Sequence, residues 1–163
     1  MPQIQWSDSL ASGLASMDET HREFITLYNL LAGAGPEEFL ARMDAFIDHT
    51  QAHFDQENRW MEAVNFPGCH RAEHDRVLAV TQDVRKRVEQ GDLFLGKRLV
   101  DELPAWFDSH VNGMDAALAF HLESIGFDVT TGAFRDGGNA PGAGQAKGCA
   151  CVVPDEADTQ QAA

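Results

Sequence analysis

Apolar residues recur along most of the chain at alternating steps of three and four positions, which is the spacing of one face of an α-helix. Four stretches carry such a stripe, and breaks rich in glycine or proline separate them: residues 17–31, 39–64, 70–88 and 99–120. Because short breaks join neighbouring helices that run in opposite directions, the pattern predicts an all-α protein, an up-down-up-down four-helix bundle.

Three residues refine the ends of these helices. Asp18 is predicted as the N-cap of the first helix, and Pro36 as the first residue of the second, because these positions suit the two residue types. Pro104 lies inside the fourth stripe. A proline removes a backbone hydrogen bond and clashes with the preceding helical turn, so we expect it to kink or divide the fourth helix.

The helical spacing is lost at both ends of the chain. Residues 1–16 predict an irregular N-terminal arm, with Trp6 as its large apolar anchor. Residues 127–163 hold six glycines and no sustained period, so we expect a flexible, disordered Gly/Ala-rich C-terminal tail. The chain is therefore predicted to consist of a bundle over residues 1–126 and a tail over residues 127–163.

Polar residues interrupt the apolar stripes or, in one case, lie one step beside a stripe. They are five histidines and two carboxylates: His21, His53, Glu57, His70, His74, His110 and Asp115. Buried without partners, they would destabilise the core, so a shared metal site explains them better than separate buried or surface side chains. His70 and His74 are four residues apart, which places both imidazoles on one helical face, one turn apart.

The ligand types restrict the metal. Neutral imidazole together with carboxylate suits iron, copper or zinc better than calcium or magnesium. The candidate ligands exceed the four of a typical zinc site, so we expect two metal ions rather than one. Glu57 and Asp115 come from the second and fourth helices, and each could bridge the two ions with one oxygen apiece.

The two remaining histidines are expected to lie outside this set. His49 precedes His53 by one helical turn, so it either supports that ligand from outside or is only partly buried, and we favour partial burial. His121 lies near the end of the fourth helix, where a positive imidazole suits the helix dipole, and we expect it at the surface.

Composition narrows the possible partners. The chain has 163 residues, enough for one domain with one core, and a formal net charge of −14, so we expect neither nucleic acid nor an anionic membrane to bind it. Its start carries neither a basic region nor an apolar run, and no stretch approaches the length of a membrane span, so we expect a cytoplasmic protein. Cys149 and Cys151 lie in the tail, where a metal, redox or partner-binding role is open and incidental thiols are favoured.

Over residues 4 to about 126 the sequence resembles a bacterial hemerythrin. The matching stretches are IQWSDSLASGLASMDETH, HFDQENRWM, FPGCHRAEHDRVL and WFDSHVNGMD. The resemblance implies a non-haem centre of two iron ions, bridged by oxo or hydroxo oxygen. It also implies the ligand assignment: one iron held by His70, His74 and His110, the other by His21 and His53, and both bridged by Glu57 and Asp115.

The resemblance further implies a monomer that binds molecular oxygen reversibly and is not an enzyme, for storage or for delivery to an oxygen-consuming enzyme. Oxygen would bind at the iron held by two histidines, which keeps an open position. A dry apolar pocket would protect it. Candidate residues for this oxygen pocket are Phe24, Trp106 and Phe107, whereas Phe54 is better explained as core packing. The sequence departs from the family pattern at Asn58, where the usual HFxxEE has its second glutamate.

Two alternatives of other functional classes remain. One is a di-iron oxidase or peroxidase, but ferritin-like enzymes of this kind use carboxylate-rich sites with Glu-x-x-His, a motif that the chain lacks. Five neutral imidazoles favour reversible cycling of iron over oxidation of a substrate. The other is a sensor of oxygen, nitric oxide or redox state, in which the tail could carry the contact with a partner.

Overall fold

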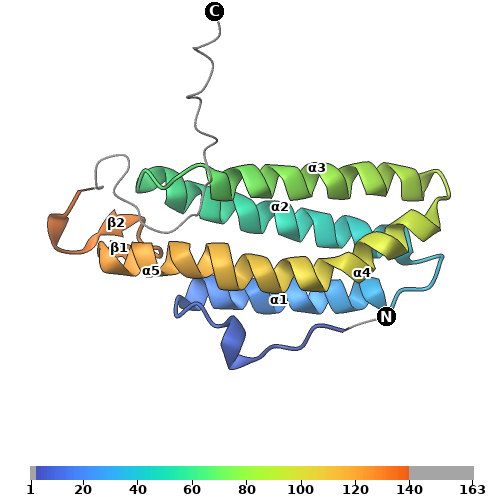
Figure 1. The fold of residues 1–163 in the computed structure, drawn as a ribbon, viewed down its shortest axis with the longest axis horizontal. Helices are drawn as coiled ribbons and strands as arrows, with labels where there is room; N and C mark the ends of the chain where they lie inside the picture. Colours follow the sequence, from blue (N-terminus) through green and yellow to red (C-terminus); the bar gives the residue numbers. More distant parts are fainter. Residues whose placement is uncertain (1–2, 140–163) are drawn as a thin grey trace, which may run out of the picture.

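The computed structural model describes residues 3–139 of the chain. Its main helices are α1 (Ala15–Ala32), α2 (Phe39–Ala63), α3 (Cys69–Glu89), α4 (Leu93–His110) and α5 (Ala116–Ser124), with a π-helical turn over Val111–Asp115 between the last two. The segments α4, π-turn and α5 continue one another as a single rod, which packs beside α1 and α3 (Figure 1). The molecule is therefore the all-α, up-down-up-down four-helix bundle that the sequence predicts.

Two predicted helix starts are wrong. The first helix begins at Ala15, so Asp18 lies within its first turn instead of capping it. The buried Asp18 carboxylate accepts hydrogen bonds from the backbone and the hydroxyl of Ser12, both 2.7 Å long, and so ties the N-terminal arm to the helix. Pro36 lies in the turn before α2, which begins at Phe39.

Of the two predicted effects of Pro104, division of the fourth helix does not occur, because α4 continues through the proline to His110. A residue four positions after Val100 would normally donate its backbone N–H to the Val100 carbonyl, and a proline there cannot. The hydroxyl of Tyr28, from α1, donates to this carbonyl instead, at 2.9 Å. The lost helical hydrogen bond is thus replaced from a neighbouring helix.

The apolar core consists of two large clusters, one at each end of the bundle, and a small third cluster of Phe54, Val77 and Leu78. The first includes Tyr28 and Phe46 and lies where α1 ends and α2 begins. The second includes Met17 and Leu118 and lies where α1 begins and α2 ends. Along α1, α2 and the α4–α5 rod, the polar residues singled out by the sequence lie between these clusters, so apolar packing closes the site from both ends.

Ordered packing continues past Gly126, where the sequence predicts the tail to begin. Strands β1 (Phe127–Asp128) and β2 (Ala133–Phe134) form an antiparallel hairpin, followed by a 3-10 turn over Arg135–Gly137. Phe127 is buried in the second cluster, and Arg135 pairs with Glu123 of α5 at 2.9 Å. Residues 127–134 show no helical period in the sequence because they form this hairpin. The rest of the predicted tail, including Cys149 and Cys151, lies outside the described residues.

The N-terminal arm runs along α1 (Figure 1). It contains a 3-10 turn over Asp8–Leu10, and Trp6 packs against the first cluster with the guanidinium of Arg22 4.0 Å from its ring centroid. Trp6 therefore anchors the arm, as the sequence predicts. Among the described residues, no helix is both long and apolar enough to cross a membrane.

Candidate metal centre

The structure brings together all of the polar residues that the sequence singled out. Each is at most 4% exposed. Their ligand atoms form two groups, each compact enough to share one ion. The larger group contains Glu57, His70, His74, His110 and Asp115, and the smaller contains His21, His53 and Glu57. The sequence predicts only which helical faces carry these residues. The structure shows that the four rods of the bundle turn those faces toward one point.

A π-helical turn lets His110 and Asp115 face the same point. In a regular α-helix, a step of five residues rotates the side chain by about 500°, which leaves the two side chains about 140° apart. The turn over Val111–Asp115 accommodates an extra residue, as π-helical insertions at functional sites do. His110 Nε2 consequently lies 3.1 Å from Asp115 Oδ1. This local distortion explains how Asp115 can face the centre although it lies one step beside the apolar stripe in the sequence.

Three imidazoles converge in the larger group. The Nε2 atom of His110 lies 3.3 Å from that of His70 and 3.2 Å from that of His74. A neutral imidazole carries only one N–H, so three ring nitrogens facing one another cannot all be satisfied by hydrogen bonds among themselves. Ligand atoms bound to one ion at about 2.1 Å lie about 3 Å apart, so the spacing fits a shared metal ion.

Asp115 lies between the two groups and offers one oxygen to each. Its Oδ1 atom is 3.0 Å from Nε2 of His70 and 3.1 Å from Nε2 of His110. Its Oδ2 atom is 3.1 Å from Nε2 of His21, in the smaller group. Neither oxygen is oriented for a hydrogen bond with a described residue, although both are buried. Such orphaned oxygens fit a carboxylate that bridges two cations.

Glu57 is placed in the same way. Its Oε1 atom lies 2.8 Å from Nε2 of His53, in the smaller group. Its Oε2 atom lies 3.5 Å from Nε2 of His70 and 3.4 Å from Nε2 of His74, in the larger group. The two carboxylates therefore span the same gap from opposite helices.

Both carboxylates are ionised despite their burial. Burial raises the pKa of Asp115, but the charge of His110 and the nearby ring nitrogens outweigh it and hold the pKa well below its ordinary value. Burial and the charge of Asp115 raise the pKa of Glu57, but the charge and the hydrogen bond of His53 outweigh them and lower it to about 2. Within residues 3–139 the ion pairs of both carboxylates involve only histidines, so a bound cation is well suited to balance them.

Sequence reasoning missed a residue that supports a candidate ligand. The Nδ1 atom of His74 donates to the side-chain oxygen of Asn58, at 3.0 Å. This leaves Nε2 of His74 unprotonated toward the centre, which is how outer hydrogen bonds orient metal-ligating histidines. Burial also lowers the pKa of His74, which favours the neutral ring. The sequence marked Asn58 only as a departure from the family pattern, because its contact depends on how α2 packs against α3.

Aromatic side chains cover both groups. Phe24 and Phe107 are buried and stack on each other with ring centroids 4.4 Å apart, and the Phe107 ring lies 5.7 Å from that of His21. Phe54 is fully buried in the core and stacks on His74 at 3.9 Å, so it also covers a candidate ligand. These rings make the surroundings of the centre apolar.

Trp106, the remaining candidate for the oxygen pocket, lies on the side of the larger group. Its ring stacks on His110 with centroids 4.8 Å apart. It is only partly buried, and its centroid is 6.4 Å from that of Phe24. Trp106 therefore connects the aromatic cover of both groups to the surface of the bundle.

The other two histidines differ in outcome. His49 is partly buried, and its Nε2 atom lies 3.2 Å from the Thr20 carbonyl oxygen, as the favoured interpretation of partial burial requires. The predicted surface position of His121 is wrong, because this residue is only 6% exposed. Phe66, from the α2–α3 connection, packs against it with ring centroids 5.4 Å apart. A contact with a distant segment leaves no trace in the period of the last helix.

Fold and site together define a four-helix-bundle protein whose buried histidines and carboxylates form a metal-binding cluster. Residues 12–119 match the model of the hemerythrin HHE cation binding domain. The chain belongs to the hemerythrin family, which confirms the resemblance seen in the sequence.

Two bacterial relatives give the same result. The chain is 50% identical over 131 residues to a bacteriohemerythrin of Ralstonia nicotianae, a match that covers 79% of this chain and 96% of that protein. It is 29% identical over 130 residues to a bacteriohemerythrin of Stenotrophomonas maltophilia, covering 76% of this chain and 84% of that protein. No solved structure matches the chain significantly.

Proposed function

We propose that this protein binds molecular oxygen reversibly at a centre of two iron ions, for storage or for delivery to an oxygen-consuming enzyme. One observation carries the proposal: Glu57 and Asp115 each direct one oxygen toward a group with three histidines and the other toward a group with two. This arrangement suits two bridged ions with unequal sets of ligands. The smaller set leaves room for a further ligand.

The residues present fit two such ions. His70, His74 and His110 would hold one, His21 and His53 the other, and the two carboxylates would bridge them. When bound, the iron pair would supply a reversible exchange of two electrons with oxygen. The five neutral imidazoles would add no negative charge to that of the two carboxylates. A ligand set with so little negative charge favours return to the ferrous state over high-valent oxidation.

The surrounding residues restrict water and protons. Phe24 and Phe107 pack beside the smaller group with rings that carry no exchangeable proton. Phe54 and Trp106 cover the larger group. Keeping proton donors away from bound oxygen protects reversible binding from irreversible oxidation of the iron. The same features favour an oxygen carrier over an oxidase.

Metal analysis and a visible spectrum test this proposal. Protein purified from its native cell should contain two irons per chain. Reduced, colourless protein should become coloured under air and lose the colour again under nitrogen. One iron per chain, or zinc in place of iron, would contradict the two-iron centre. Catalytic consumption of oxygen with a reductant, without a reversible coloured form, would replace the carrier by an oxidase.

A further inference from the structure

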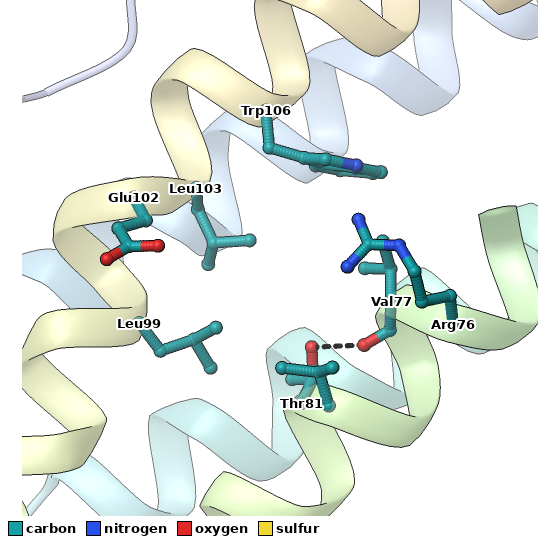
Figure 2. Close-up of a pocket in the computed structure, with 8 residues that line it drawn as sticks. Arg76, Val77, Thr81, Leu99, Glu102, Leu103 and Trp106 are labelled. Carbon is teal, nitrogen blue, oxygen red and sulfur yellow. Dashed lines mark hydrogen bonds between the residues drawn. The ribbon is translucent and has the colours of Figure 1, made fainter.

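A surface groove lies between α3 and α4, beside the metal centre. Its volume is about 140 Å³. Leu99 and Leu103 point into it from α4, and Val77 borders it from α3 (Figure 2). Trp106 lies across one end (Figure 2). The groove, which Arg76, Thr81 and Glu102 also line, therefore offers small solutes a partly apolar surface that leads to a single aromatic side chain.

Trp106 separates this groove from the candidate ligands. It lines the groove, and its ring also stacks on His110, with centroids 4.8 Å apart and planes inclined by 23°. Its ring centroid is 6.2 Å from that of Phe54, which covers His74. A rotation of Trp106 away from His110 would thus join the groove to the aromatic surroundings of the larger group.

A charged pair at the rim of the groove fixes the indole. The Nε1–H of Trp106 donates to Oε1 of Glu73, at 2.9 Å. Arg76 in turn donates to both oxygens of Glu73, through Nε at 2.8 Å and Nη2 at 2.6 Å. A bidentate pair of this kind holds the carboxylate in one orientation, so its hydrogen bond to the indole is directional.

We propose that Glu73 is a positioning residue: through its hydrogen bond to Trp106, it holds the indole closed between the groove and the metal centre, and so limits the entry of water and small solutes. The claim that such entry harms reversible oxygen binding rests on the proposed function. The claim that Glu73 controls the position of the indole is independent of it.

The first experiment measures the exposure of Trp106 in the full chain loaded with zinc, which is colourless. In a Trp6→Phe, Trp60→Phe background, Trp106 is the sole tryptophan, and acrylamide quenching reports its exposure. Glu73→Ala should increase the population of the open ring about fivefold, the change expected for loss of one ordinary hydrogen bond. The quenching constant should rise accordingly.

Two variants separate this role from a general effect of charge or folding. Glu73→Gln keeps an oxygen that accepts the indole N–H and should retain most of the protection. Glu102→Ala removes the same charge from the same groove, but Glu102 pairs with Arg98 at 3.5 Å and should leave quenching unchanged. Equal quenching in Glu73→Ala and the unsubstituted protein would overturn the proposal. So would an equal rise in Glu102→Ala.

The second experiment uses the iron-loaded protein and a double-mutant cycle. Glu73→Ala should accelerate oxidation of the ferrous protein by a similar, roughly fivefold factor, again set by the lost hydrogen bond. In a Trp106→Phe background, which has no indole N–H, the same substitution should have little further effect. An undiminished effect there would show that Glu73 acts by another route. Failure of reversible oxygen binding would leave the zinc experiment valid, so the two proposals can fail separately.

Discussion

The two groups of candidate ligands share their bridging carboxylates but differ in what surrounds them. In the larger group, Asn58 holds the outer nitrogen of His74, and Trp106 stacks on His110. The Nδ1 atoms of the other four candidate histidines, His21 and His53 as well as His70 and His110, have no hydrogen-bond partner among the described residues. In the smaller group, the rings of Phe107 and Phe24 pack beside His21 and His53. On the proposed function, we therefore expect the larger group, with the Asn58 support, to be the firmly held half of the centre, and the smaller group, beside the phenylalanine rings, to be the dry half that admits a small ligand.

The largest effect is expected from His74→Ala, which removes a ligand from the firmly held half. Loss of a buried imidazole should abolish iron loading and lower the melting temperature, because metal binding contributes directly to folding stability. Metal analysis and thermal unfolding would measure both.

His49→Ala is the matched control for this substitution. His49 lies on the same bundle but bonds a backbone carbonyl and belongs to neither group of ligands. His121→Ala is unsuitable, because the buried His121 contributes to packing. Full iron content in the His74→Ala protein would mean that the three-histidine group is not a metal site.

The dry half is tested by Phe107→Ala. Truncating a buried phenylalanine costs about 3–5 kcal/mol of unfolding free energy and opens space beside His21 for water. Oxidation of the ferrous protein should therefore accelerate, as stopped-flow spectroscopy would show. Phe94→Ala is the control, because Phe94 is 74% exposed and its loss should change stability by less than about 0.5 kcal/mol. Unchanged oxidation in Phe107→Ala would remove the proposed role of the aromatic cover.

A smaller effect is expected at Asn58. Asn58→Leu removes the acceptor for His74 Nδ1–H, and loss of such an outer hydrogen bond weakens metal binding by about 10–100-fold. Asn58→Asp should instead strengthen binding, because a carboxylate makes the imidazole more basic. Competition with a chelator would measure both changes. Gln51→Leu, which removes an amide bonded to Asp55 at the surface of α2, should have no effect on metal binding. Equal affinities for all three variants would show that the larger group does not depend on its outer support.

The smallest effect is expected from shortening the chain, because neither half draws a ligand from beyond α5 in this interpretation. Truncation after Asn139, assayed in reducing buffer, should leave iron content and oxygen binding unchanged. Truncation after Gly126 should cost about 2 kcal/mol, the usual value for one large buried apolar side chain, because it also removes Phe127. Chemical unfolding would distinguish the two. Loss of iron on truncation after Asn139 would place residues 140–163 in the site.

The sequence by itself determined the four helices and the set of candidate ligands. Both depend on intervals within a single helix, and the 3.6-residue period of the helix makes such intervals readable without any knowledge of the neighbours. His70 and His74, or His53 and Glu57, share a face for this local reason. The predicted bundle follows because four such faces can be buried only against one another.

Only the tertiary structure decided how the helices rotate against one another and where their regular geometry is interrupted. The π-turn over Val111–Asp115, the Tyr28 hydroxyl beside the carbonyl that Pro104 leaves free, and the burial of His121 under Phe66 all depend on contacts between helices and connections far apart in the sequence. The outer hydrogen bonds of Asn58 and Glu73 do too. The period of one helix carries no information about these contacts, because a side chain's partner is set by the rotation and height of the neighbouring segment.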